Sequence, residues 1–236
     1  MSIRNVTRDE MIEVERIMTE EFKVDMLVMM ENAGKSLAVM ARELLGKDVL
    51  EKKIAVLVGK GNNGGGGLAA CRHLHNWGAN IDMIMAFKKH ELKDAPRRQF
   101  DMLEKMDIPL IEEYQQTLEG YHLLIDTLIG YNSTQNPREP IATIIMNADA
   151  SGVPILSLDV PSGLDATSGT PYTPAIRATT TLCLALPKSG IVTREAKPYV
   201  GSLYLADISI PKAIYSKFGV DARKLFSKTF IVRLNY

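Results

Sequence analysis

The sequence predicts an α/β protein in which a mostly parallel β-sheet lies between two layers of helices. Short runs rich in Val, Ile and Leu alternate with longer segments of helical periodicity from residue 54 to residue 206, and such alternation is typical of parallel sheets. The first of these runs, residues 54–58, is apolar throughout, as expected for a strand buried on both faces. We therefore expect a Rossmann-like, three-layer αβα sandwich with additional helices at the N-terminus.

Two helices are expected before the first strand. Residues 7–22 begin with Thr7 as a possible N-cap and acidic residues in the first turn, and apolar residues then recur at helical spacing. A second helix is expected over about 24–45. Its methionine-rich face indicates core packing, but Glu31 and Asn32 interrupt that face, which makes them candidates for a more specific role.

The rest of the chain is expected to alternate strands with helices. No repeat, linker or change of composition divides it, so residues 1–236 are predicted to form one domain. The expected strands are 54–58, 80–87, 108–111, 121–126, 153–159, 179–186 and 202–206. The expected helices are 68–76, 92–106 and 141–150. Residues 229–232 leave two alternatives: a last strand, or a segment that lies in the groove of a partner.

A glycine-rich segment, 59–67, is expected to turn the chain from the first strand into a helix that begins near Leu68. Outward-pointing N–H groups and the helix dipole favour a phosphate there. Residues 59–64 match G-x-G-x-x-G, but the acidic residue that usually binds the ribose would fall near Asp82, at the start of a strand rather than its end. No Lys-Ser or Lys-Thr pair follows, which excludes a Walker A loop. The alternative is a tight turn in which glycine only relieves crowding.

Acidic residues end two of the expected strands. Asp126 and Asp159 each follow an apolar run, and ligands of parallel sheets bind beyond the carboxyl ends of the strands. A carboxylate at such a position is costly to desolvate unless it is paired or coordinated. We expect the two aspartates to converge on one ligand or cation. The alternative is that each stabilises its own loop.

Composition excludes several classes of protein. The 28 basic and 28 acidic residues cancel, which argues against nucleic acid or an anionic membrane as a partner. Cys71 and Cys183 are too few for a disulfide framework and are expected to be buried. Neither a signal peptide nor an apolar run of membrane-spanning length is present. A cytoplasmic location is therefore expected.

Six segments match the motifs of one known family, in order and over nearly the whole chain. They read M-E-N-A-G at 30–34, G-K-G-N-N-G-G at 59–65, D-T-L-I-G at 126–130, D-V-P-S-G-L-D at 159–165, P-K-S-G at 187–190 and D-I-S-I-P at 207–211. Together they resemble the NAD(P)H-hydrate epimerases, also called the YjeF N-terminal domain family. The resemblance implies an isomerase that interconverts the R and S epimers of hydrated NADH and NADPH. It also implies functional coupling to an ATP- or ADP-dependent dehydratase, and no part of this chain resembles a dehydratase domain.

The resemblance also implies a set of site residues. A potassium ion would be held by Asn63, Asp126 and Ser162, whose oxygen atoms suit an alkali cation. A homodimer, formed through the N-terminal helices, is a further implication. The dinucleotide substrate would be contacted by Asn62, Asn63, Gly64, Gly65, Gly66, Gly130, Tyr131, Asn132, Ser133, Thr134, Gln135, Asn136 and Asp159.

One position departs from the family pattern. The family motif reads G-N-N-G-G-D-G, and this chain has Gly66 in place of the aspartate. If that aspartate is catalytic, the protein is slow or inactive; if it only orders the loop, binding weakens and the chemistry survives. Asp159 is then the candidate acid–base residue for proton transfer to and from the substrate hydroxyl. Lys188 either approaches a phosphate or is a solvated surface lysine.

Two other functions compete with this interpretation. The first is a catalytically impaired nucleotide-binding or scaffold module of the same fold, which Gly66 favours. The retained Asn63 and Asp126 argue against it, because a scaffold has no use for cation ligands. The second is a Rossmann dehydrogenase, which the misplaced ribose carboxylate and the absence of a substrate domain disfavour.

Overall fold

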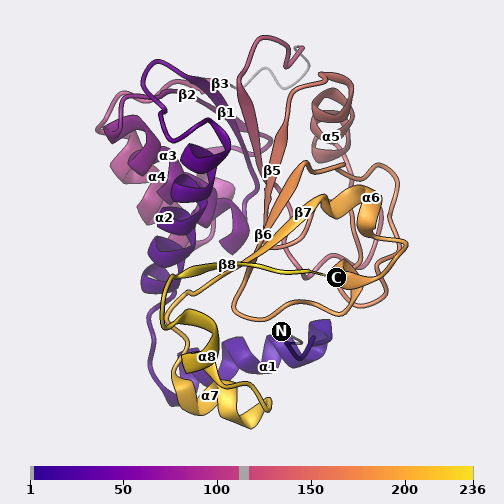
Figure 1. The fold of residues 1–236 in the computed structure, drawn as a ribbon. Coiled ribbons are helices and arrows are strands. Elements are labelled where there is room, and N and C mark those ends of the chain that lie inside the picture. The colour runs from indigo at the N-terminus through magenta and orange to yellow at the C-terminus, as the bar shows by residue number, and fades with distance from the viewer. Residues whose placement is uncertain (1–2, 112–116, 236) are drawn as a thin grey trace.

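The computed structural model describes residues 3–111 and 117–235, and all strands within them form one sheet (Figure 1). The strand order is β3-β2-β1-β4-β5-β6-β7-β8. Neighbouring strands are parallel except β7 and β8, which are antiparallel. The strands are β1 (Lys53–Val58), β2 (Asn80–Met85), β3 (Leu110–Ile111), β4 (Leu123–Thr127), β5 (Ile155–Leu158), β6 (Thr180–Leu184), β7 (Ser202–Ala206) and β8 (Ile231–Arg233).

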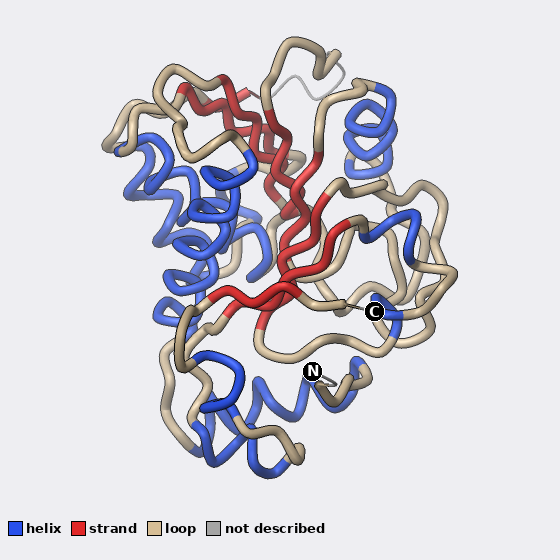
Figure 2. The backbone as a smooth tube through the Cα atoms, in the orientation of Figure 1, coloured by secondary structure: helices blue, strands red, loops and turns tan. Residues whose placement is uncertain are grey.

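Helices cover both faces of this sheet, which confirms the expected α/β sandwich (Figure 2). In Figure 1, α2, α3 and α4 lie on one side, α5 lies on the other, and α1, α7 and α8 gather below the sheet. The α-helices are α1 (Arg8–Arg16), α2 (Met26–Leu44), α3 (Asn62–Asn76), α4 (Asp94–Glu104), α5 (Ile141–Ala150), α6 (Lys197–Val200), α7 (Lys212–Lys217) and α8 (Ala222–Phe226). The π-helical turn η1 (Ile17–Glu21) and the 3₁₀ turns η2 (Lys89–Glu91) and η3 (Gly190–Val192) complete the set.

Strand β1 shows why the central strands are apolar throughout. Successive side chains of a strand point to opposite faces of the sheet. Ile54 and Val56 pack in the core beneath α2, α3 and α4, whereas Ala55 and Leu57 pack in the core beneath α5. All four are fully buried, so neither face tolerates a polar residue. The order of the strands reverses beside β1, between β1 and β4, which is where such folds bind ligands.

The expectation that helix α3 begins near Leu68 is wrong, because it begins at Asn62. The turn itself is only residues 59–61, and the later glycines lie buried in the first turns of the helix. A Cβ at Gly34 would lie 2.4 Å from the Cβ of Ala69, and one at Gly67 would lie 2.3 Å from Oγ1 of Thr127. The glycines therefore allow α3 to approach α2 and β4 closely. These glycines do relieve crowding, but in a helix and not in the tight turn that the alternative assumed.

The first helix and the last strand form where the sequence predicts them. Thr7 caps α1 in a capping box with Glu10, as the first-turn pattern predicts. Residues 229–232 contribute to β8, which extends the sheet, so the first of the two alternatives is correct. Both cysteines are buried, as predicted.

Within the described ranges, each helix is too short or too polar to cross a membrane.

Glu31 links two helices. Its carboxylate accepts hydrogen bonds from Arg72 at 2.5 Å and from Nε2 of His73 at 2.8 Å, both on α3. The neighbouring Asn32 donates to the backbone carbonyl of Ile208 at 3.3 Å. The two polar residues that interrupt the apolar face of α2 therefore hold that helix against its neighbours.

Replacing Glu31 with Gln is expected to lower the free energy of unfolding by about 1 kcal/mol at pH 7, equivalent to about 2–4 °C in Tm. Partial burial raises the pKa of Glu31, but the hydrogen bonds from Arg72 and His73 outweigh it and the pKa is lowered. A carboxyl group whose pKa is lower in the folded state than in the unfolded state stabilises the fold at pH values above its ordinary pKa. This stabilisation is lost as the pH falls through the pKa of the folded state. Thermal melts at pH 7 and pH 3 test this, with the exposed Glu43→Gln as control. An equal difference at both pH values would contradict it.

Candidate functional site

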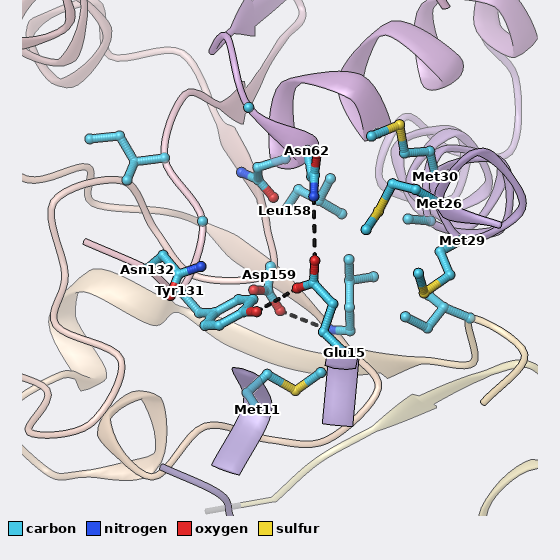
Figure 3. A pocket seen from close by; sticks show the side chains of 18 of the residues that line it. Met11, Glu15, Met26, Met29, Met30, Asn62, Tyr131, Asn132, Leu158 and Asp159 are labelled. Atoms are coloured by element: carbon cyan, nitrogen blue, oxygen red, sulfur yellow. Dashed lines mark hydrogen bonds between the residues drawn. The ribbon is translucent and has the colours of Figure 1, made fainter. Parts of the chain in front are cut away.

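A cavity of about 340 Å³ opens beyond the carboxyl ends of the strands (Figure 3). Its walls come from α1, α2, the N-terminus of α3 and the segments that follow β4, β5 and β6. One side is apolar and contains Met11, Met18, Met26, Met29 and Met30. The polar residues of the lining are Glu15, Asn62, Asn63, Lys93, Tyr131, Asn132, Asp159 and Lys188. The cavity therefore combines an apolar wall with a small set of groups able to exchange protons.

Asp159 follows β5 directly and is 4% exposed. Its backbone has a φ of 68°, in the left-handed region that Asp and Asn tolerate better than other non-glycine residues. The carboxylate forms an ion pair with Lys188, and its Oδ1 also accepts the N–H of Leu184 at 3.2 Å. Asp159 is thus a buried carboxylate at the wall of the cavity.

Lys188 is 1% exposed, so the expectation of a solvated lysine is wrong. Its Nζ donates to Asp159 and to the carbonyl of Leu184 at 2.9 Å. Burial lowers the pKa of Lys188, but the interactions with Asp159 and Cys183 together outweigh it and the pKa is raised. The ammonium also lies 5.6 Å from the centre of the Tyr131 ring. Lys188 is therefore a charged partner of Asp159 inside the protein.

Glu15 reaches the cavity from α1 (Figure 3). Its carboxylate accepts a hydrogen bond from the hydroxyl of Tyr131 at 2.5 Å and one from Nδ2 of Asn62 at 3.4 Å. Desolvation and the charge of Glu15 both raise the pKa of Tyr131, which keeps the phenol a neutral donor. The sequence interpretation missed Glu15. A signal was available, because Glu15 lies between Met11 and Met18 at helical spacing, so an acidic residue shares their buried face.

Two of the three predicted cation ligands, Asp126 and Ser162, are in direct contact. Asp126 is fully buried and accepts hydrogen bonds from the hydroxyl and the N–H of Ser162, at 2.6 and 2.9 Å. It also accepts the hydroxyl of Ser157 at 2.8 Å and the N–H of Leu128 at 3.2 Å. Burial raises the pKa of Asp126 despite these bonds, which act to lower it. Asn63, at the start of α3, has a buried amide nitrogen without a hydrogen-bond partner among the described residues.

The structure brings some of the predicted substrate residues to the cavity and not others. Those that line it are Asn62, Asn63, Gly66, Gly130, Tyr131, Asn132 and Asp159. Gly64 and Gly65 lie within α3 behind the wall, and Ser133, Thr134, Gln135 and Asn136 lie on the loop outside it. The cavity lining does not include Asp126 or Ser162 either. Asp159 lines the cavity, whereas Asp126 accepts hydrogen bonds from Ser162. The expected convergence of the two aspartates on one ligand or cation stays a prediction.

A mostly parallel sheet, a cavity beyond its strand ends and a helix N-terminus in the cavity wall define an α/β protein of the class in which nucleotides commonly bind at this place. The N-cap of α3 is Gly61, which has no side chain to satisfy the free N–H groups of the first turn. The family described as YjeF-related protein N-terminus matches residues 26–190. The chain belongs to this family, and the resemblance to NAD(P)H-hydrate epimerases is confirmed.

Individual relatives agree with this assignment. A protein of Dehalogenimonas lykanthroporepellens named NAD(P)H-hydrate epimerase is 36% identical over 99% of this chain and 94% of its own length. A protein of Moorella thermoacetica named bifunctional NAD(P)H-hydrate repair enzyme Nnr is 30% identical over 93% of this chain, which spans only 43% of that relative. The crystal structure of the yeast protein YNL200c has the same fold, with a TM-score of 0.86 at 24% identity over 98% of this chain and all of the yeast chain.

Proposed function

We propose that the protein is an isomerase that interconverts the R and S epimers of hydrated NADH and NADPH. The observation that supports this most strongly is the cavity itself, whose lining includes Asn62 and Asp159 of the family motifs and Tyr131, which directly follows the motif at 126–130. The name of the Dehalogenimonas relative, which matches almost the whole chain, supports the same activity.

The substrate would bind with its two halves in different surroundings. A volume of about 340 Å³ is at the lower end of the range for pockets that hold drug-sized ligands, so it suits the hydrated nicotinamide ring rather than a whole dinucleotide. The uncapped N-terminus of α3 would bind the pyrophosphate through the N–H groups of its first turn. The rest of the molecule would extend along the exposed loop from Ser133 to Asn136.

The reaction changes the configuration of a ring carbon bonded to both nitrogen and hydroxyl. Loss of the hydroxyl as water, with the nitrogen lone pair stabilising the resulting cation, is followed by return of water to the other face. Ring opening and closure is the other route. Both routes require a group that gives and accepts a proton at the hydroxyl. We assign this role to Asp159, which Lys188 holds in place at the wall of the cavity.

A potassium ion held by Asn63, Asp126 and Ser162 belongs to the same proposal. The donor atoms are hard oxygens. In Asn63 the ligand would be Oδ1, because the unpartnered Nδ2 is a hydrogen-bond donor and cannot contact a cation. The four hydrogen bonds that Asp126 already accepts mean that an ion would have to share its carboxylate with Ser157, Ser162 and Leu128. When bound, the ion would supply positive charge beside the N-terminus of α3.

Potassium is expected to raise the Tm by a few degrees relative to sodium at equal ionic strength. A ligand at ten times its Kd stabilises the folded state by about 1.4 kcal/mol, which is about 3–6 °C for a chain of this size. Melting curves in KCl and NaCl measure this, and Asn63→Ala should remove the difference. Equal midpoints of the native protein in both salts would rule out the ion site.

Activity is tested directly by epimer interconversion, starting from the R epimer of hydrated NADH and coupled to an S-specific dehydratase. The native chain is compared with Gly66→Asp, because a Cβ at Gly66 would lie 2.8 Å from Cδ2 of Leu158, the mobile end of a side chain that can shift. A native rate well above the spontaneous rate supports the proposal. If only Gly66→Asp exceeds it, the native chain is the impaired nucleotide-binding module. If neither does, the proposed activity is wrong.

Two partners are also proposed. A separate dehydratase would consume the S epimer, and the name of the bifunctional Moorella relative supports such a coupling. A second copy of the chain would pack against the N-terminal helices, where Ile12, Phe22 and Val28 are 39%, 42% and 49% exposed. Sedimentation equilibrium distinguishes a dimer from a monomer, and a monomer at micromolar concentration would contradict this second proposal.

A further inference from the structure

We propose that Glu15 is a second acid–base residue of this site, acting on the substrate hydroxyl from a different wall of the cavity than Asp159. The inference rests on the proposed epimerase function. Among the described residues, Glu15 and Asp159 are the two acidic side chains that line the cavity. Gly66, which stands on the α3 wall, contributes no carboxylate.

The contacts of Glu15 suit a group that gives up and takes back a proton. Oε2 accepts from Tyr131 and Oε1 accepts from Asn62, so each oxygen has one neutral donor and keeps lone-pair capacity for a ligand. Asp159 differs, because a buried ammonium is bonded to its carboxylate. The described residues provide Glu15 with no ion pair. The two carboxylates of the cavity therefore have different surroundings, as acid and base partners in one site require.

Glu15 is held in this position by the attachment of α1 to the rest of the fold. Val6 forms a bridge to Lys188, in which its N–H donates to Pro187 at 2.9 Å and its carbonyl accepts from Ser189 at 2.8 Å. The N–H of Arg8 donates to Oγ1 of Thr167 at 3.0 Å. The same segment that supplies Lys188 to the cavity therefore fixes the start of α1, and a catalytic group on a rigid element keeps its geometry.

Two carboxylates on different walls suit the removal of water from one face of the ring and its return to the other. Protonated Glu15 transfers its proton to the hydroxyl, the C–O bond breaks, water leaves, and the nitrogen lone pair forms a C=N⁺ bond. Water then attacks the opposite face, the new C–O bond forms, and Asp159 accepts the proton that the attacking water loses. The reverse reaction uses the two groups in exchanged roles. No oxidant or other reactant is required.

The test compares Glu15→Gln with Glu13→Gln in the coupled epimerisation assay. Gln at position 15 keeps the size of the side chain and one of its two acceptor oxygens but cannot transfer a proton, so kcat should fall about 10²-fold while KM changes less than threefold. Glu13 lies on the same helix, is exposed and binds Arg16, so its variant should keep the native kcat. Glu15→Asp, which keeps the charge but retracts the carboxylate, should lose at least tenfold.

The outcomes separate this inference from the proposed function. A native protein no faster than spontaneous epimerisation overturns both. An active native protein whose Glu15→Gln and Glu15→Asp variants stay within twofold of its kcat overturns the role of Glu15 alone. A loss of kcat in Glu15→Gln with an unchanged Tm supports it. If Glu15→Gln fails to fold, the kcat of Glu15→Asp decides between the two results.

Discussion

Replacing Asp159 with Asn is expected to slow epimer interconversion by about 10²–10⁴, the usual contribution of general acid–base catalysis. Asn cannot exchange a proton at the substrate hydroxyl. It tolerates the left-handed backbone of this position, where φ is 68°, so the turn after β5 keeps its course. We therefore expect kcat to fall while the conformation of the loop stays unchanged.

The measurement is kcat and KM for the R epimer, with circular dichroism to verify that the variant is folded. Asp101→Asn is a suitable control, because Asp101 has an exposed side chain on α4 and is not part of the cavity lining. Unchanged epimerisation by Asp159→Asn would remove Asp159 from the mechanism. A loss shared equally by Asp101→Asn would show an effect unrelated to the site.

Replacing Lys188 with Met is expected to lower the free energy of unfolding by about 3–5 kcal/mol, because it leaves a buried carboxylate without its partner. Lys188 is 1% exposed and Asp159 is 4% exposed, so solvent cannot replace the lost ammonium. A Met side chain is similar in length and fills the space of the lysine stem. The loss of the charge, rather than a loss of side-chain volume, should therefore cause most of the decrease in the free energy of unfolding.

A double-mutant cycle separates these two causes. In Lys188→Met with Asp159→Asn, neither charge remains, so most of the lost stability should return. Urea unfolding of the native protein, both single variants and the double variant gives the coupling free energy. Strictly additive losses would show that the two residues stabilise the fold independently, which is incompatible with a buried ion pair.

Local patterns predicted much of the fold. Thr7 and Glu10 at the start of α1, and the continuous apolar run of β1, reflect rules that act over a few residues. The start of α3 did not follow from such rules, because glycine is a poor helix former. There the close approach of Gly34 to Ala69 outweighs local propensity, and only the packed structure reveals that approach.

The site was predictable where a motif marks it and not where distant segments meet. Asn62 and Asp159 belong to recognisable motifs, and both line the cavity. Lys188 lies 29 residues from its partner Asp159, and lysine is rarely fully buried unless it is paired, so a solvated lysine was the reasonable expectation. Glu15 binds Tyr131, which lies 116 residues further along the chain. The only local signal was the position of Glu15 on the apolar face of its helix.

Helix α1 lies outside the family match but contributes to the cavity lining. The family match starts at residue 26, and a fragment starting there would keep all the described strands, since β1 begins at Lys53. It would lack Met11, Glu15 and Met18, and with them one wall of the cavity. The smallest piece that retains the sheet is thus shorter than the smallest piece that retains the binding space. A fragment with the boundaries of the family match alone would therefore lack part of the lining of this cavity.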